Sequence, residues 1–494
     1  MKKSKFAILL TTAALIFGQL AACGGTGDVV ETGDTRTDES TESTTAVEYV
    51  KPDIDLGGET FTIASHDFGM SYAVCKYTMI SHEEQNGDTL NDAVIDMTRK
   101  VEDELNVKLE LYPLLDEDRH GADKLSRFIL AGEDVVQAAF PLSSGLAQLL
   151  ATPSMLVDLG TIETLDLSHS WWDQHSIESY NIGGKQYTAI GDSCFFMKCA
   201  PIVNFFNKQL IEDNGLENPY QLVYDGKWTF DKMNEMAEAA ANDLNGNGEV
   251  DIEDCFGFTG ESTGVASFMV GAGINFSSRT GDEVEITLFS DRAATMIEKI
   301  VPLWRNKNVT LLDQDFYGKY GSPFEELFIP TFMANRSLFF SNQLLLALDF
   351  REMDADFGIL PLPKYDESQS EYYSTTNIYW RDNLIVPVTN PDLERTGYIL
   401  DCMGYYSQQL VTPAFIDSTV LNKSVRDEDS ASMIELIYDT QVYDIALLFN
   451  WGDMNGMLAN LATNNNTLLA SEYAKIEPNI IAAMEKTMEE LLGE

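Results

Sequence analysis

The segment TFTIAS at residues 60–65 decides the fold class, because a helix and a second strand follow it. Its residues alternate between apolar and polar, which predicts a strand with Phe61 and Ile63 on one face. Residues 107–111 alternate in the same way. Strand, helix and strand in this order form a βαβ unit, which implies a parallel sheet. The helix between the strands is predicted from the helical spacing of Leu90, Val94, Met97, Val101 and Leu105.

Strands and helices continue to alternate along most of the chain. Apolar runs at residues 135–140 and 201–206 predict buried strands, and helical spacing predicts helices over residues 230–241 and 293–304. The predicted fold class is therefore α/β. The roughly 440 residues that follow the N-terminal segments suggest two or three domains of about 150 residues each.

The first 23 residues have the pattern of an export signal. Lysines precede an apolar run from Phe6 to Phe17, and small residues stand before a cysteine. A transmembrane helix is the alternative, but a span needs about 20 apolar residues. The stretch Leu20-Ala-Ala-Cys23 resembles the bacterial lipobox, which implies that residues 1–22 are removed and that Cys23 is lipidated. We therefore expect a protein anchored by lipid to the extracytoplasmic face of the cell membrane.

Residues 23–51 differ in composition from the rest of the chain. They are rich in Gly, Thr, Ser, Asp and Glu and contain few apolar residues. Such a segment cannot bury enough surface to fold, so we predict a flexible acidic tether. The folded part is expected to begin near Pro52.

The chain is strongly acidic, with 79 Asp and Glu residues against 32 Lys and Arg and a formal net charge of −47. This charge argues against nucleic acid and anionic membrane surfaces as partners, whereas neutral or cationic solutes remain. Solubility alone is the simpler explanation of the charge. Six cysteines are present, and lipidation of Cys23 leaves an odd, sparse set, so neither a disulfide framework nor a zinc cluster is expected.

Two patterns that are typical of catalytic or metal sites are interpreted as chance matches. Residues 260–264 read Gly-Glu-Ser-Thr-Gly, but an α/β-hydrolase needs a histidine after the serine, and all five histidines precede Ser262. His169 and His175 have a spacing that zinc helices do not use, so a packed aromatic corner is expected there. A carboxylate pair for glycoside hydrolysis stays open, because distances in space are not visible in a sequence.

Residues 243–254, DLNGNGEVDIED, have the pattern of a calcium-binding loop. Oxygen-bearing side chains stand at loop positions 1, 3, 5, 9 and 12, and the glycine at position 6 permits a sharp turn. Position 12 is aspartate rather than the usual glutamate, which resembles dockerin-type loops. A solvated acidic loop is the alternative reading. We predict a structural calcium ion whose ligands are Asp243, Asn245, Asn247, Glu249, Asp251 and Asp254.

Several short segments, spread over residues 55–460, together resemble a known family. They include WWD at 171–173, GKQY at 184–187, NFFNK at 204–208, WTFD at 228–231, FGF at 256–258 and DFGILPLP at 356–363. In this order the chain resembles the family 1 extracellular solute-binding proteins of ABC importers, the group that includes maltose-binding protein. The resemblance implies a receptor, not an enzyme, that captures a solute, most often a carbohydrate, and delivers it to a membrane permease.

The resemblance also implies a two-lobe, periplasmic-binding-protein-like fold of type II with a hinge of crossing strands. Lobe 1 would hold residues 52–195 and 356–402, and lobe 2 would hold residues 196–355 and 403–490. The crossing strands would lie near residues 194–206 and near Ala355. We expect a monomer that closes on its ligand. The alternatives are a surface carbohydrate-binding lipoprotein without a permease and a secreted glycoside hydrolase.

Loops that follow strands at the cleft between the lobes are expected to bind the solute. In this family aromatic rings stack on sugars and planar polar groups bind their hydroxyls. Asn342 and Gln343 stand where relatives often carry an aromatic residue. The candidate ligand-binding residues are His66, Asp67, Ser143, Ser144, Asp192, Phe195, Ser341, Asn342, Gln343, Tyr379, Trp380, Arg381 and Trp451.

Overall fold

The structure is a computed structural model of the 494-residue chain. The predicted signal peptide, the lipidation site Cys23, most of the predicted tether and the predicted calcium ligand Glu249 lie outside the residues that it describes. None of the described helices is long and apolar enough to cross a membrane. The described residues are 49–68, 72–115, 121–248, 251–422 and 425–493.

The βαβ unit predicted from residues 60–111 is confirmed. Strand β1 (Glu59–His66) pairs in parallel with β2 (Val107–Leu114), and Phe61 lies opposite Leu109. Helix α1 (Thr89–Leu105) connects them, and the side chain of Asp88 caps its first turn by accepting the N–H of Asn91. Strand β3 (Ala138–Phe140) completes a parallel sheet in the order β2-β1-β3.

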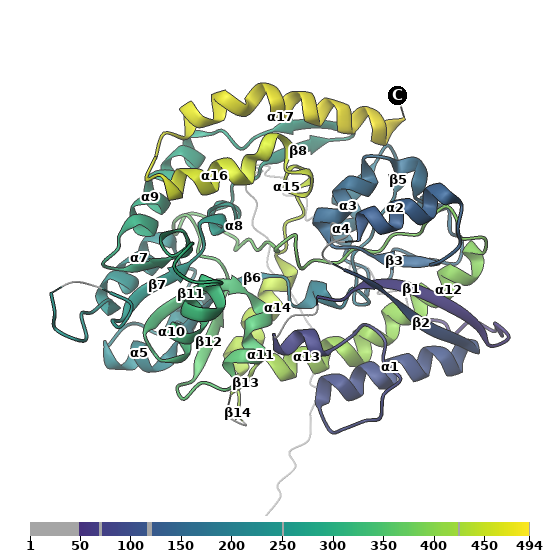
Figure 1. Cartoon of the computed structure of the whole chain (residues 1–494), viewed down its shortest axis with the longest axis horizontal. Coiled ribbons are helices and arrows are strands. Elements are labelled where there is room, and N and C mark those ends of the chain that lie inside the picture. Colours follow the sequence, from purple (N-terminus) through teal and green to yellow (C-terminus); the bar gives the residue numbers. More distant parts are fainter. Residues whose placement is uncertain (1–48, 69–71, 116–120, 249–250, 423–424, 494) are drawn as a thin grey trace, which may run out of the picture. The chain divides into compact units, whose positions relative to one another are not determined.

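Helix α1 packs on this sheet through the apolar face predicted from its spacing. Leu90, Val101 and Leu105 have no exposed surface, and burial of each such side chain contributes roughly 1.5–3 kcal/mol. Helices α12 (Leu393–Tyr406) and α13 (Thr412–Thr419) lie along α1, as Figure 1 shows. The earlier helices of this part of the chain are α2 (Ala122–Ala131), α3 (Ser143–Leu150) and α4 (Gln174–Tyr180).

A second, mixed sheet of five strands has the order β10-β7-β11-β6-β12. Strand β11 is parallel to β7, and β6 is antiparallel to both β11 and β12. Every residue of β6 and β11 is buried, so this sheet is covered on both faces. The strands are β6 (Ile202–Asn207), β7 (Phe256–Gly260), β10 (Thr310–Leu312), β11 (Ser337–Gln343) and β12 (Phe357–Leu360).

The remaining elements are helices and three short hairpins. Helix α17 runs along α16, which in turn contacts α8 and α9 (Figure 1). The hairpins are β4 (Asn181–Ile182) with β5 (Lys185–Gln186), β8 (Ser277–Thr280) with β9 (Glu283–Ile286), and β13 (Leu421–Asn422) with β14 (Val425–Arg426). The helices are α5 (Lys208–Asp213), α6 (Pro219–Tyr224), α7 (Phe230–Ala240), α8 (Val265–Gly271), α9 (Asp291–Arg305), α10 (Ile329–Met333), α11 (Ala347–Phe350), α14 (Glu428–Asp439), α15 (Ile445–Phe449), α16 (Met454–Thr463) and α17 (Leu469–Leu492).

Two segments, residues 189–202 and 374–385, connect the two sheets and pair with each other. We call them the crossing segments. The N–H of Ile202 donates to the carbonyl of Thr375 at 2.9 Å, and the N–H of Asn377 donates to the carbonyl of Ala200 at 3.0 Å. Further along, Leu384 bridges to Ala189 and Ile385 bridges to β3. The chain therefore passes from one sheet to the other twice at the same place.

The first crossing segment overlaps the crossing predicted near residues 194–206, but the second lies later than the predicted position near Ala355. Strand β12 still pairs with β6 in the five-stranded sheet, although the sequence assigns residues 356–402 to lobe 1. Likewise α13 packs on α1 of the three-stranded sheet, although residues 403–490 are assigned to lobe 2. A short apolar strand fits either sheet by its pattern, so periodicity cannot decide its partner. The extents of the two lobes as a whole stay a prediction.

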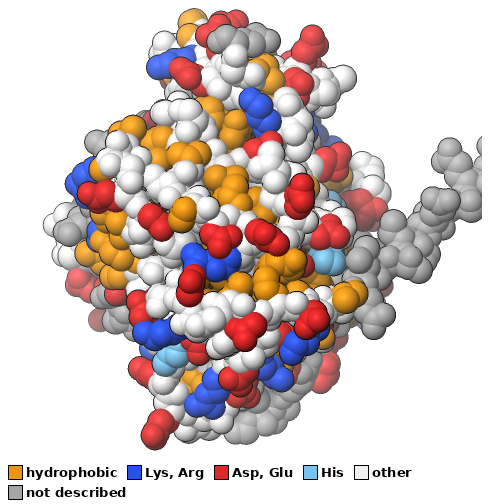
Figure 2. Space-filling view, turned by 90° about the vertical axis from the view of Figure 1, so that its right-hand side faces the viewer, with side chains coloured by type: hydrophobic (Ala, Val, Ile, Leu, Met, Phe, Trp, Pro, Cys, Tyr) orange, Lys and Arg blue, Asp and Glu red, His pale blue; other side chains and the backbone are white. Residues whose placement is uncertain are grey.

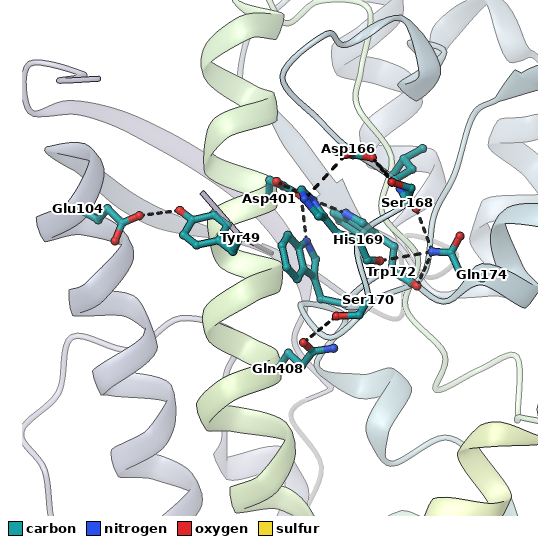
Figure 3. A network of polar contacts seen from close by, with 12 residues as sticks. Tyr49, Glu104, Asp166, Ser168, His169, Ser170, Trp172, Gln174, Asp401 and Gln408 are labelled. Atoms are coloured by element: carbon teal, nitrogen blue, oxygen red, sulfur yellow. Dashed lines mark hydrogen bonds and ion pairs between the residues drawn. The ribbon is translucent and has the colours of Figure 1, made fainter. Parts of the chain in front are cut away.

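The predicted aromatic corner at residues 169–175 is confirmed, and a buried carboxylate organises it (Figure 3). One oxygen of Asp401, on α12, accepts hydrogen bonds from His169 Nδ1 at 3.1 Å, Trp171 Nε1 at 3.0 Å and Trp172 Nε1 at 3.3 Å. Burial raises the pKa of Asp401, and these donors oppose the rise. The histidine thus serves in packing, which agrees with the interpretation of its spacing.

The surface carries the acidic charge that the composition predicts. On the face drawn in Figure 2, Lys and Arg side chains are interspersed with Asp and Glu, and apolar side chains lie between them.

In the described part of the chain Cys75, Cys194, Cys199, Cys255 and Cys402 are free thiols, which confirms that these residues form no disulfide framework.

Candidate functional site

A cavity of about 610 Å³ lies beside the crossing segments, at the ends of β7 and β11. Residues 375–381 of the second crossing segment form one part of its lining. Ends of strands are the usual place for a ligand in α/β sheets. Other lining residues are Tyr72, Gly260, Glu261, Phe258, Phe268, Trp304, Phe324, Ser341, Asn342, Gln343, Asp444, Asn450, Asp453 and Asn455.

Six of the predicted ligand-binding residues line this cavity. Ser341, Asn342 and Gln343 end β11, and Tyr379, Trp380 and Arg381 belong to the second crossing segment. Tyr379 is 53% exposed, whereas Trp380 is nearly buried. The sequence therefore predicted two separate stretches that the fold brings to one cavity. Whether they bind a solute stays a prediction.

Two further predicted residues stand directly behind the cavity lining. Ser143, at the start of α3, accepts the Nε–H of Arg381 at 2.7 Å and so supports a lining residue. His66, at the end of β1, contacts Phe68, whose ring stacks on Trp380 with centroids 3.9 Å apart. Neither Ser143 nor His66 is among the lining residues.

The other five predicted residues are placed elsewhere by the fold. The main-chain N–H of Ser144 donates to the carbonyl of Ile378, and the main-chain N–H of Asp67 donates to the carbonyl of Leu114. Asp192 accepts hydrogen bonds from Gln408 and Thr412, and burial raises its pKa. Phe195 packs edge-on against Phe196.

Trp451 is the fifth of these residues, and it packs away from the cavity. Its ring stacks on Phe449, and its indole N–H donates to Thr487 of α17 at 3.0 Å. Trp451 is also nearly buried. Its described contacts therefore serve the packing of the C-terminal helices.

Arg381 is held rigidly by neutral partners. Its guanidinium donates to Ser143 Oγ, to Thr376 Oγ1 at 3.0 Å and to the hydroxyl of Tyr180 at 2.9 Å. It also lies over the ring of Tyr443, 5.4 Å from the centroid. Because three donors of the guanidinium already have partners, the side chain is fixed in one geometry before any ligand arrives.

Glu261 is one of three acidic residues of the cavity lining, with Asp444 and Asp453, that the sequence did not single out. It directly follows Gly260, the last residue of β7. A Cβ at position 260 would lie 2.7 Å from the ring of Phe258, so this position requires glycine. Its Oε2 accepts a hydrogen bond from Asn342 Nδ2 at 3.2 Å. Burial, strengthened by the nearby charge of Asp313, raises the pKa of Glu261 to about 7.

Glu261 belongs to the Gly-Glu-Ser-Thr-Gly pattern at residues 260–264, in which the sequence analysis considered only the serine. In the structure the N–H of Ser262 donates to Asp313 at 2.9 Å, and Ser262 begins a short 3₁₀ turn. The signal that could have found Glu261 is its position. It is the first residue after a buried strand, at the strand's carboxyl end.

The predicted calcium loop is folded back on itself. The two carboxylate oxygens of Asp243 accept the N–H groups of Gly246 and Gly248, at 2.6 and 2.8 Å. Asp254 is fully buried and accepts the N–H groups of Leu244 and Asp251. These bonds connect the two ends of the described part of the loop.

Other side chains of the same loop converge on one carboxylate. The amides of Asn245 and Asn247 both approach Asp251 Oδ2, at 3.5 and 3.0 Å. A 180° rotation of either amide group places its oxygen where its nitrogen now lies. Oxygen is the ligand atom that calcium prefers. Among the described residues no group of three or more His, Cys, Asp or Glu side chains is arranged to hold a metal. The predicted ligands have the oxygen-bearing side chains that calcium needs, but their described arrangement forms no such group, so calcium binding stays a prediction.

Comparisons with known proteins show the fold. No protein-family model matches the chain, and no curated protein matches it in sequence. Many solved structures do match. One is an ABC substrate-binding protein from Listeria monocytogenes in complex with cycloalternan, at 13% identity and a TM-score of 0.57, over 87% of this chain and 99% of that chain.

Two further structures give the same picture. The GacH receptor of Streptomyces glaucescens, described unliganded and with acarbose, matches at 12% identity and a TM-score of 0.54, over 88% of this chain and 99% of its own. A sugar transporter protein from Rhizobium etli in an open conformation matches at 14% identity and a TM-score of 0.55, over 87% of this chain and 98% of its own. The α/β fold predicted by resemblance to maltose-binding-protein-like receptors is thereby confirmed.

The raised pKa of Glu261 predicts a specific dependence of stability on pH. Its pKa in the folded state, about 7, lies above the ordinary value of 4.5, so the folded state holds a proton that the unfolded state releases between these values. The free energy of unfolding therefore falls as pH rises through this window, by up to about 3 kcal/mol from this group. Glu261→Gln removes the loss, because the amide does not ionise.

Urea unfolding of the wild type and of Glu261→Gln at pH 4.5 and pH 8 measures this effect. We expect the variant to gain stability over the wild type on going to pH 8. An equal difference between the two proteins at both pH values would show that Glu261 ionises normally.

Proposed function

We propose that this protein is an extracytoplasmic receptor that captures a saccharide in the cavity and delivers it to the permease of an ABC importer. The observation that carries the proposal is the cavity beside the two crossing segments, whose lining combines aromatic rings with planar polar groups. Aromatic faces suit the apolar faces of sugar rings, and amide and guanidinium groups suit their hydroxyls. Similar folds in solved structures with cycloalternan and acarbose support the choice of ligand class.

The mechanism requires no covalent chemistry. The crossing segments link the two sheets, so a change in their backbone angles would move one sheet relative to the other. A saccharide that contacts both sides of the cavity would have a higher affinity for the closed form, and this difference would drive closure. The closed form is then the one that the permease would recognise.

Anchoring through Cys23 completes the proposal. A lipid on this residue and the acidic tether behind it would keep the receptor at the extracytoplasmic face of the membrane. By the square-root relation for flexible linkers, about 27 residues span roughly 26–31 Å on average. This reach lets the receptor bind solute and meet a permease without leaving the membrane.

A thermal-shift and calorimetric screen over mono- and oligosaccharides, polyamines and peptides tests the ligand class. We expect at least one saccharide to stabilise the protein, by about 2.7 kcal/mol at 100 times its Kd. Tyr379→Ala should weaken that binding by roughly 3- to 10-fold, because the variant loses an exposed ring of the cavity lining.

Tyr224→Ala is the matched control. Tyr224 is also 53% exposed, but it ends α6 and its hydroxyl donates to Asp429, away from the cavity lining. We expect saccharide binding to be unchanged in this variant. Stabilisation by polyamines or peptides alone would contradict the saccharide assignment, and release of shorter sugars during incubation would indicate a glycoside hydrolase instead.

We also propose that the loop at residues 243–254 takes a structural calcium ion. Calcium would bind the folded loop and not the unfolded chain, so it would raise the melting temperature. We expect EDTA to lower the melting temperature of the wild type and to leave that of Asp243→Ala unchanged. If EDTA has no effect on the wild type, the loop is a self-closed acidic turn without a metal.

A further inference from the structure

Glu261 is a half-buried carboxylate that the protein does not neutralise. Among the described residues no Lys or Arg side chain lies within ion-pair distance of it. Its side-chain hydrogen-bond partner in the described part of the chain is the amide of Asn342, which bonds Oε2. Its other oxygen, Oε1, has no hydrogen-bond partner there and belongs to a residue that lines the cavity.

The amide of Asn342 cannot change its orientation to suit another ligand. Its Oδ1 accepts the main-chain N–H of Gln343 at 2.8 Å, which leaves the NH₂ group for Glu261. Asn342 therefore supports the carboxylate of Glu261.

The charged and titratable groups around Glu261 increase its demand for a cation. Burial and the charge of Asp313 raise the pKa of Glu261. Burial is the main cause of the raised pKa values of Tyr72 and Tyr317, and the charge of Glu261 adds to both. Asp444 and Asp453 also line the cavity. Arg381 is the basic residue of the described lining, and its guanidinium already bonds Ser143, Thr376 and Tyr180.

Aromatic rings line the same cavity. Trp304 donates its indole N–H to the carbonyl of Glu261 at 3.1 Å, and its ring contacts those of Phe258 and Phe268, with centroids 4.7 and 4.9 Å apart. Trp304, Phe258 and Phe268 are almost fully buried, so they form an apolar wall behind Glu261 that supplies no positive charge to balance it. The net charge of −47 also concentrates cationic solutes near the protein.

We propose that the ligand carries a protonated amino group, which binds Oε1 of Glu261, so that the receptor selects an amino sugar over the corresponding neutral sugar. This proposal rests on the proposed saccharide-binding function and narrows its ligand class. The ammonium would form a charge-assisted hydrogen bond with the carboxylate inside the cavity, while Asn342 holds the other oxygen.

Isothermal titration at pH 7.5 with matched sugar pairs tests the proposal. The pairs are glucose with glucosamine, galactose with galactosamine, mannose with mannosamine, and cellotetraose with the tetramer of glucosamine. For the pair that binds, we expect the amino sugar to bind at least about 10-fold tighter than the neutral sugar. The N-acetylated sugar, which has no positive charge, should lose this advantage.

Glu261→Gln should abolish the preference for the amino sugar and retain binding of the neutral one, because the amide keeps the shape and removes the charge. Glu238→Gln, on the exposed surface of α7, changes the net charge equally and serves as the matched control. The control should retain the preference.

The outcomes separate this proposal from the proposed function. Equal or tighter binding of the neutral sugar would overturn the amino-sugar inference and leave the saccharide receptor standing. A preference that survives in Glu261→Gln would also overturn it. Binding of none of these sugars, neutral or cationic, would overturn the inference, and failure of the wider saccharide screen would then overturn the function as well.

Discussion

The pairing of the two crossing segments is the interaction on which the rest of the structure depends. Residues 189–202 and 374–385 bond to each other through their main chains, and each joins one sheet to the other. Buried main-chain groups must find partners, so these bonds fix where the chain can leave one sheet and enter the next. The cavity follows from this arrangement, because the second segment forms part of its lining.

The charged side chains of Arg381 and Glu261 differ in how the fold satisfies them. The guanidinium of Arg381 donates hydrogen bonds to Ser143, at the start of α3, and to the hydroxyl of Tyr180. Its charge is therefore already hydrogen-bonded before a ligand binds. Glu261 has one amide partner and an acidic neighbour in Asp313. A half-buried carboxylate without a cationic partner costs stability. Raised pKa values of this kind cluster at functional sites, and this is the reason for proposing a ligand contact at Glu261.

Much of the fold was predictable from periodicity. The strand at Phe61 and Ile63, helix α1 and the strand after it were found because each buries one face and so has a regular apolar pattern. The partner of β12 was not predictable, since four apolar residues carry no information on which sheet they join. The packing of α13 on α1 depends likewise on contacts between segments far apart in the chain.

The site was predictable in part for the same reason. Ser341, Asn342 and Tyr379 were found because loops after strands were expected to meet, and the fold brings them to one cavity. Trp451 was a reasonable candidate by residue type, but its contacts with Phe449 and Thr487 depend on the path of α17. Glu261 was missed because one acidic residue is unremarkable in a chain with 79 of them, although its place at the end of a buried strand was a usable signal.

A crystal structure with the tightest-binding saccharide would show directly where this protein binds its ligand. We expect the sugar to lie in the cavity beside the crossing segments, in contact with Trp380 and with Glu261 or Asn342. We also expect a change in the backbone angles of the crossing segments relative to a crystal structure without sugar. A sugar bound elsewhere, with the cavity filled only by water, would contradict the account.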